Sequence, residues 1–284
     1  MIKDAMFWEK RGEKVRCLLC PHNCVIGEGQ YGLCSVRTNM KGTLKTINYG
    51  EITAAALDPI EKKPLHYFYP GSYIFSVGTF GCNFSCGFCQ NYTIAHYRAK
   101  SIYMPPEELE KKCSSIDGNI GIAFTYNEPS IWYEYVYDTA KLIKEKHKDL
   151  KVVLVTNGYI EKEPLFQLLP YVDAMNIDLK SFREDTYRKV CGGELKNVLR
   201  TIETCYDKCH IEITTLLVSG MNDSLEEVED IASFLASLDK NIPLHLTRYF
   251  PNYKFINPPT DIDFMKKAKE VASKYLNHVR LGNV

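Results

Sequence analysis

The chain has 284 residues, of which 45% are hydrophobic and 25% are charged, a composition ordinary for a globular protein. Lys and Arg together number 35, as do Asp and Glu, so no net charge steers the chain toward nucleic acid or an anionic membrane. No apolar run approaches the roughly 20 residues that span a bilayer, and residues 1–16 lack the apolar centre of a signal peptide. We therefore expect a cytoplasmic protein with no membrane segment, and the composition argues against a nucleic-acid partner.

The first 65 residues predict a small cysteine-rich segment that is held by metal rather than by an apolar core. Its four cysteines, which lie within eighteen residues of one another, are Cys17, Cys20, Cys24 and Cys34. Disulfides are disfavoured in a reducing compartment, so grouped cysteines indicate metal. Four thiolates complete a tetrahedral zinc site or a [4Fe–4S] cluster equally well, and unligated thiols are the third alternative. All three alternatives stay open at this point.

The run from Pro64 to Gly71 carries turn residues at both ends. We place the domain boundary there, which gives an N-terminal cysteine-rich segment at 1–65 and a second domain at 66–284.

From residue 73 onward, short apolar runs rich in β-branched residues alternate with helix-like stretches. The predicted strands are Tyr73–Thr79, Ile120–Tyr126, Val152–Thr156, Ala174–Leu179, Ile211–Val218 and Leu244–Tyr249. Helical patterns cover Pro105–Cys113 and Ser224–Leu238, and the second begins with a capping box of Ser224 and Glu227. This alternation predicts an α/β fold with a parallel sheet. Six units favour a partial (β/α)6 TIM-like barrel, with an open doubly wound sheet as the alternative.

Polar residues or glycines follow each of these strands. Among them are Asn127 and Glu128 after the second strand, Asn157 after the third and Lys180 after the fourth. Because the carboxyl ends of parallel strands meet at one edge of the sheet, we expect a ligand site at that edge.

The first strand leads directly into the spacing C-x3-C-x2-C, formed by Cys82, Cys86 and Cys89. Thiolates are the ligands of iron–sulfur clusters, and three of them can hold three corners of a [4Fe–4S] cubane while one iron stays open. An open coordination position is the mark of a site that binds a substrate. The alternatives are a structural zinc site short of one ligand, or buried cysteines without metal.

This cysteine motif, with Phe88 before its last cysteine, resembles the signature of the radical S-adenosylmethionine (SAM) superfamily. The resemblance implies that the open iron chelates the amino and carboxylate groups of SAM. It further implies that an electron from the reduced cluster cleaves SAM to a 5′-deoxyadenosyl radical, which abstracts hydrogen from a substrate.

The resemblance also assigns roles to the residues at the strand ends. Asn127 and Glu128 lie where relatives receive the SAM amino group, and Lys180 could pair with the SAM carboxylate. Asn157 matches a Thr-Asn-Gly turn of the activase branch, and the resemblance implies that all four residues help to hold SAM. The chain departs from the activase branch on the fifth strand, where Thr214 and Thr215 replace an arginine, and Arg248 is a candidate substitute.

The N-terminal Cys-x2-Cys-Pro-His-x-Cys pattern, together with Thr-Tyr-Asn-Glu-Pro at 125–129, is similar to the radical SAM protein of the AmmeMemoRadiSam system, a group similar to pyruvate formate-lyase activating enzymes. This similarity implies an activase-like oxidoreductase with an electron donor such as flavodoxin or ferredoxin, and a protein, peptide or small-molecule substrate. Many members continue with a further cysteine-containing tail, so the chain is either a short member or a truncated one.

Two rival functions are radical SAM modification of RNA and a non-enzymatic iron–sulfur electron carrier or metal scaffold. The first predicts a basic patch at the barrel mouth. The second predicts clusters closed by four ligands. Tyr126 and Tyr249 lie at strand ends and are candidate hydrogen donors to a radical. His245 alternates with Leu244 and Leu246, so its side chain either faces the barrel lumen or is a hydrogen-bonded core histidine, which is the more frequent outcome.

Overall fold

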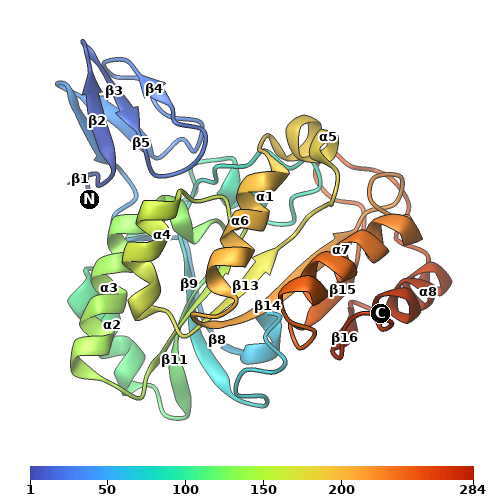
Figure 1. Ribbon diagram of the computed structural model, residues 1–284. Helices are drawn as coiled ribbons and strands as arrows, with labels where there is room; N and C mark the ends of the chain where they lie inside the picture. Colours follow the sequence, from blue (N-terminus) through green and yellow to red (C-terminus); the bar gives the residue numbers. More distant parts are fainter.

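The computed structural model describes all residues from Met1 to Val284 and consists of a curved eight-stranded sheet with a smaller β-rich segment at one end (Figure 1). The sheet order is β16-β15-β14-β13-β12-β11-β9-β8, and every neighbouring pair is parallel except β8 and β9. The strands of this sheet are β8 (Ala54–Pro59), β9 (Tyr73–Gly78), β11 (Asn119–Phe124), β12 (Lys151–Thr156), β13 (Ala174–Asp178), β14 (His210–Leu217), β15 (Leu244–Arg248) and β16 (Val279–Gly282). The predicted partial barrel is therefore confirmed.

All six predicted strands are present, and the sheet gains one strand at each edge. β16 adds a parallel strand after β15, and β8 adds an antiparallel strand beside β9. β8 lies before the boundary predicted at residue 65, so the last strand of the predicted N-terminal segment is built into the barrel sheet. The division of the chain into independent domains stays a prediction.

Helices cover the outer face of the sheet, as expected for strand–helix–strand connections. They are α1 (Tyr92–Ala95), α2 (Pro106–Ser115), α3 (Tyr133–Lys146), α4 (Lys162–Leu168), α5 (Glu184–Thr186), α6 (Leu195–Cys205), α7 (Leu225–Leu238) and α8 (Ile262–Ala272), with 3-10 turns at Ile60–Lys62, Pro129–Trp132 and Leu169–Tyr171 and a π-helical turn at Tyr187–Cys191. Ser224 caps α7 as predicted, since its hydroxyl accepts from Glu227 N at 3.2 Å. No helix is long and apolar enough to cross a membrane.

The N-terminal segment contains two small antiparallel sheets, which project from the barrel beside α4 (Figure 1). Its strands are β1 (Lys3–Asp4), β2 (Trp8–Arg11), β3 (Lys14–Cys17), β4 (Val25–Ile26), β5 (Arg37–Met40) and β6 (Thr43–Thr46), and β7 (Glu51–Ile52) pairs with β10 (Ile102–Tyr103). The buried ion pair of Arg37 and Glu134 joins this segment to α3, and both side chains are 1% exposed.

The connection between β8 and β9 closes the lower end of the barrel. Its residues Ile60, Leu65 and Phe68 pack against the early strand positions in an apolar cluster that also contains Ile74, Ala123, Val153 and Ala174. Burying each large side chain stabilises this floor by roughly 1.5–3 kcal/mol. The run from Pro64 to Gly71 that suggested a domain boundary therefore contributes Leu65 and Phe68 to an apolar plug of the barrel.

A buried carboxylate ties this floor to the opposite side of the barrel. Glu212 on β14 has no exposed side-chain surface and accepts from the backbone N–H groups of His66 (2.9 Å) and Tyr67 (2.7 Å). It also lies 2.9 Å from His210 Nε2 and 2.6 Å from His245 Nε2. Burial alone raises its pKa, but the hydrogen bonds from the two histidines and the backbone outweigh burial and lower the pKa to about 2.

We predict that Glu212 makes the fold sensitive to acid. Because its pKa is lower in the folded chain, its stabilisation is complete above pH 4.5 and is lost as the pH falls toward 2. The shift corresponds to about 3 kcal/mol, of which about 2 kcal/mol is lost by pH 3. Urea unfolding of the wild type and Glu212→Gln at pH 7, 5 and 3 measures this effect. The gap in unfolding free energy between them should shrink as the pH falls; a constant gap contradicts the prediction.

Candidate functional site

The three cysteines of the motif line one cavity of about 810 Å³ at the carboxyl ends of the parallel strands. None of the cysteines forms a disulfide. The cavity is also lined by all four strand-end residues expected to bind SAM, which are Asn127, Glu128, Asn157 and Lys180. The expectation that these ends come together at one edge is therefore correct for the residues singled out.

Asn127 holds the start of the cysteine loop. Its Oδ1 accepts from Thr79 N at 3.0 Å, and its Nδ2 donates to Gly81 O at 2.8 Å. Gly81 has φ +94°, and a Cβ there would lie 2.7 Å from Cys34 O of the N-terminal segment. The loop therefore leaves the strand through a turn that only glycine accommodates. This turn packs between the sheet and the segment of the N-terminal cysteines.

Asn157 holds the middle of the same loop. Its Nδ2 donates to Asn83 Oδ1 at 2.8 Å and lies 3.8 Å from Cys82 Sγ, while Asn83 Nδ2 donates to Tyr159 O at 2.8 Å. Asn83 is 3% exposed and Asn157 is 4% exposed, so both are buried. The side-chain amide of Asn157 therefore helps to position Cys82.

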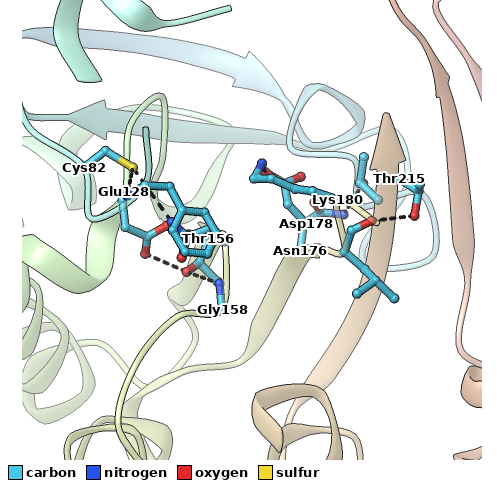
Figure 2. A network of polar contacts seen from close by, with 12 residues as sticks. Cys82, Glu128, Thr156, Gly158, Asn176, Asp178, Lys180 and Thr215 are labelled. Carbon is cyan, nitrogen blue, oxygen red and sulfur yellow. Dashed lines mark hydrogen bonds and ion pairs between the residues drawn. The ribbon is translucent and has the colours of Figure 1, made fainter. Parts of the chain in front are cut away.

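Glu128 supports the turn that carries Asn157 (Figure 2). Its Oε1 accepts from Ser130 N (2.9 Å) and Thr156 Oγ1 (2.6 Å), and its Oε2 accepts from Asn157 N (2.7 Å). The side chain is buried, and burial raises its pKa. An ionised carboxylate offers about four acceptor positions, so Oε2 keeps one for a ligand in the cavity.

Lys180 lies on the other side of the view in Figure 2, where its Nζ pairs with Asp178 Oδ2 at 2.9 Å. Burial alone lowers the pKa of Lys180, but attraction to Asp178 and to the thiol groups of Cys86 and Cys191 raises it well above its ordinary value. The ammonium group has three donors, and Asp178 uses one. The cavity therefore has an anionic side at Glu128 and a cationic group at Lys180.

Arg248, the candidate substitute for the missing strand arginine, does not line the cavity. Its Nε donates to Thr260 O at 2.9 Å, and its guanidinium group lies 5.0 Å from the Phe250 ring centroid. Of the two threonines at the position of that arginine, Thr214 lines the cavity, whereas Thr215 donates to Leu179 O at 2.8 Å. The expectation for Arg248 is therefore wrong in this structure. His245 and Thr247 of β15 line the cavity, and because successive side chains of a strand point to opposite faces, Arg248 points away from it.

Tyr126 is the strand-end tyrosine that faces the cavity. Its φ of +70° is rare for an aromatic residue, and its hydroxyl donates to Asp58 Oδ2 at 2.7 Å. Lys63 Nζ donates to the same oxygen at 2.8 Å and lies 4.6 Å from the Tyr126 ring centroid. Asp58 and Lys63 precede the predicted barrel, and no pattern in the sequence indicated a role for them. Tyr249 instead donates to Phe255 O and does not line the cavity.

His245 faces the lumen from β15, as its alternation with leucines indicated, and it lines the cavity together with His66. The two rings lie 5.1 Å apart between centroids, and Glu212 orients His245 through Nε2. His245 is thus a second polar side chain in the deep part of the cavity that is oriented by a carboxylate, as Tyr126 is by Asp58. The two pairs are distant from each other in the sequence.

The cavity also reaches the seam between the two edge strands of the sheet, which do not pair with each other. Glu61 and Lys62 line it from the β8 side, and Leu281, Gly282 and Asn283 line it from the β16 side. Lys62 and Asn283 are exposed, so the cavity is open to solvent at this seam.

The N-terminal cysteines Cys17, Cys20, Cys24 and Cys34 line a separate small cavity of about 10 Å³. Arg37 lies beside it, with its Nη1 3.7 Å from Cys17 Sγ. The structure brings the four thiols together as the spacing suggested. No group of three or more histidine, cysteine or acidic side chains is arranged around a common metal-ion position. The four thiols therefore share one cavity without surrounding a common metal-ion position.

The main cavity fits the group that the cysteine motif implies. Three thiols from one loop face the same space, and His96, which follows α1, lines that space with a buried Nε2 that has no hydrogen-bond partner. An orphaned buried nitrogen of this kind calls for a ligand atom. The residues present are thus compatible with a cluster and an adjoining polar cofactor.

Comparison with known proteins places the chain in a family. The model of the radical SAM superfamily matches residues 76–235. A Methanocaldococcus jannaschii protein named only as uncharacterized is 41% identical over 100% of this chain and 86% of its own length. A "putative glycyl-radical enzyme activating enzyme" of the same organism is 31% identical over 71% of this chain and 77% of its own length.

Solved structures share the fold at low sequence identity. A radical SAM methyltransferase from Sphaerobacter thermophilus matches 75% of this chain and 67% of its own with a TM-score of 0.59 and 14% identity. TYW1 with a lysine–pyruvate adduct matches 81% of this chain and 86% of its own with a TM-score of 0.56 and 16% identity. The chain belongs to the radical SAM superfamily. Several of its relatives are named as activating enzymes, one of them as a putative glycyl-radical enzyme activating enzyme. The family implies a [4Fe–4S] cluster and SAM as cofactors.

We predict that Asn157→Ala lowers the affinity of the protein for its cluster. Without the amide, Asn83 and Cys82 lose a hydrogen-bond partner, and losses of this kind cost roughly 10-fold or more in metal affinity. Iron release to a chelator from the reconstituted protein should be correspondingly faster. Asn176→Ala is the matched control, because Asn176 is equally buried but bonds Pro64 O and Thr214 Oγ1 away from the loop. Equal release from the two variants contradicts the prediction.

Proposed function

We propose that this chain is a SAM-cleaving radical enzyme in which Cys82, Cys86 and Cys89 hold three irons of a [4Fe–4S] cluster. The observation that supports this most is the convergence of the three thiols with the strand-end polar residues on one cavity. When bound, the cluster and SAM supply a 5′-deoxyadenosyl radical that abstracts hydrogen from a substrate. All other parts of the proposal concern what the residues of the chain do.

In this proposal, Asn127 and Asn157 hold the cysteine loop in shape, and Glu128 and Lys180 bind SAM. The free acceptor position of Glu128 suits the SAM ammonium group, and the two remaining donors of Lys180 suit its carboxylate. The unpartnered Nε2 of His96 is a further contact for the cofactor. Apolar residues of the loop, Phe84 and Phe88, are 3% and 4% exposed and exclude water from the cysteines.

The substrate would lie deeper in the cavity, in contact with Tyr126 and His245. Each of these groups is oriented by a buried carboxylate, Asp58 and Glu212 respectively, so each keeps a fixed direction of hydrogen bonding. We propose an activase-like reaction on a protein or peptide, with an electron donor such as flavodoxin or ferredoxin. Relatives named as activating enzymes support this subtype at 31% identity or less.

Charge at the cavity disfavours the rival reading of RNA modification. The lining includes four carboxylates, Asp58, Glu61, Glu128 and Asp178, and three lysines, Lys62, Lys63 and Lys180. All three lysines already pair with carboxylates of the same cavity, Lys62 and Lys63 with Asp58 and Lys180 with Asp178. RNA recognition calls for an excess of positive charge, which these pairs do not provide.

We further propose that the N-terminal cysteines hold a second metal site, either zinc or iron–sulfur. The shared cavity and the guanidinium of Arg37 beside Cys17 support it, since a cation offsets the charge of grouped thiolates. A bound metal would fix the position of Cys34, whose carbonyl packs on Gly81 at the start of the cysteine loop. The site would therefore stabilise the wall of the main cavity.

We predict SAM cleavage by the wild type and none by Cys86→Ala. The protein is reconstituted anaerobically with iron and sulfide and incubated with SAM and dithionite, and 5′-deoxyadenosine is measured. The wild type should form this product, and Cys86→Ala should fall to background because the cluster loses one of its three ligands. A well-loaded wild-type cluster that forms no product and shows no spectral change with SAM would contradict the enzyme function and favour the metal scaffold.

We predict that metal survives removal of the main site. A Cys82→Ala, Cys86→Ala, Cys89→Ala variant isolates the N-terminal site, and elemental analysis should find about one zinc, or about four irons with sulfide, per chain. Adding Cys20→Ser should remove it, since one of four thiolates is lost. Absence of metal from the triple variant contradicts the second site, and the element found decides between its two alternatives.

A further inference from the structure

The turn between two N-terminal cysteines contacts the cysteine loop of the main site. His22 lies in the connection between β3 and β4, two residues after Cys20 and two before Cys24. Its Nε2 lies 2.7 Å from the carbonyl oxygen of Asn83, the residue that follows Cys82. Because a carbonyl oxygen only accepts, Nε2 carries the proton and donates this hydrogen bond. No other part of the proposed function uses His22.

Three hydrogen bonds from outside the cysteine loop meet at Asn83. Its side chain accepts from Asn157 Nδ2 and donates to Tyr159 O, each at 2.8 Å, and its carbonyl oxygen accepts from His22. Asn83 is buried, so a partner that is lost leaves an unpaired polar group. The strand ends therefore hold the side chain of Asn83, whereas the N-terminal segment holds its main chain.

Aromatic packing holds the His22 ring against the same region. The ring lies 5.0 Å from that of Tyr159 between centroids, and Tyr159 lies 4.9 Å from Phe84 of the cysteine loop. A backbone bond joins the two segments beside these rings, since Glu161 N donates to Leu19 O at 2.9 Å. The contact of His22 with the loop therefore belongs to a packed interface.

His22 also lines the small cavity that the four N-terminal thiols share. The connection that carries it is closed by two backbone bonds, from Asn23 N to Cys20 O at 3.0 Å and from Cys17 N to Cys24 O at 2.9 Å. The direction of the His22 ring thus depends on where the flanking cysteines lie. One side chain therefore contacts both the N-terminal cavity and the cysteine loop.

We propose that His22 is a positioning residue that couples the N-terminal cysteine site to the cysteine loop, so that the main site binds its cluster more tightly when the N-terminal thiols hold their metal. This inference rests on the proposed function, in which the three cysteines of the loop hold the cluster and the N-terminal thiols hold a second metal.

The coupling follows from the order that the N-terminal metal imposes. The turn between Cys20 and Cys24 is restricted when both bind one metal, so the N–H group of His22 stays directed at Asn83 O. The cysteine loop then loses less conformational freedom when it takes up the cluster. Coupling of two binding sites is reciprocal, so the loaded cluster raises the affinity of the N-terminal thiols for their metal by the same factor.

The test follows the main cluster by the change that SAM causes in its electron paramagnetic resonance spectrum. Only a cluster with an open iron binds SAM, so a cluster closed by the four N-terminal thiolates does not contribute. The reconstituted protein is exposed anaerobically to an iron chelator, and samples are reduced, mixed with SAM and measured over time. The initial rate at which the signal disappears reports loss of the main cluster.

His22→Ala should lose this signal about 5-fold faster than the wild type, because Asn83 O loses its donor. His22→Gln should stay close to the wild type, since its side-chain amide still donates. Asn23→Gly is the matched control. Asn23 lies in the same turn but bonds Glu161 Oε1 at 3.2 Å and not the loop, and glycine adopts its φ of +48° freely. This control should keep the wild-type rate.

Equal rates for His22→Ala and the wild type overturn the proposal. So does loss from His22→Gln or Asn23→Gly that is as fast as loss from His22→Ala, since the donated hydrogen bond would then not be the cause.

A double-mutant cycle tests the link to the N-terminal thiols. Cys20→Ser should also speed loss of the main cluster, because the turn is no longer held by metal. Cys20→Ser combined with His22→Ala should be no faster than the faster single variant, since both interrupt the same route. Effects that multiply in the double variant, or a wild-type rate for Cys20→Ser, overturn the coupling.

The proposed function is tested separately, by formation of 5′-deoxyadenosine in the loaded wild type. If the wild type forms no product, the proposed function fails. If it forms product while the cycle shows independent effects, only the role of His22 fails.

Discussion

The cysteine loop between Gly81 and Gln90 contains no regular strand or helix, so its shape depends on hydrogen bonds from outside. Asn127 and Asn157 provide these bonds from the ends of two neighbouring strands, and Glu128 fixes Asn157 in turn. The positions of three sulfur atoms thus follow from a small buried network of amides and one carboxylate. Such a network is effective only when every member is satisfied, because an unpaired buried group costs about 1–3 kcal/mol.

The barrel interior is arranged in layers from the floor to the rim. The apolar plug of Ile60, Leu65 and Phe68 closes the lower end. A polar layer with Asp58 and Glu212 adjoins it, since Asp58 is in register with Ile74 of the plug cluster and Glu212 accepts from His66 N. The thiols and the residues proposed to bind SAM lie at the upper edge. Each carboxylate of the polar layer orients one cavity side chain, so the layer is rigid without a ligand. This order separates the chemistry of the cofactor from the groups that would meet the substrate.

Local patterns in the sequence predicted the six central strands and the convergence of their ends. The hydrophobic pattern and the flanking turn residues are enough to predict strands such as Val152–Thr156, where the apolar run is continuous. They did not predict β8, because Ala54–Pro59 lacks β-branched residues. This segment is a strand because it pairs with β9. These patterns also did not place Cys191 against Ser85 of the cysteine loop, or Asp58 beside Tyr126. These contacts join distant segments and depend on packing that no local pattern encodes.

The seam between β8 and β16 has a consequence for the size of what can enter the barrel. In a sheet that closed on itself, a molecule bound near the floor would have to pass the rim that the cofactor occupies. Here Glu61 and Lys62 on one edge and Leu281 and Gly282 on the other line the same cavity, and no backbone hydrogen bonds join these two edges. The two edges can therefore move apart without breaking a strand pair, so this wall sets no fixed limit on the width of a bound molecule.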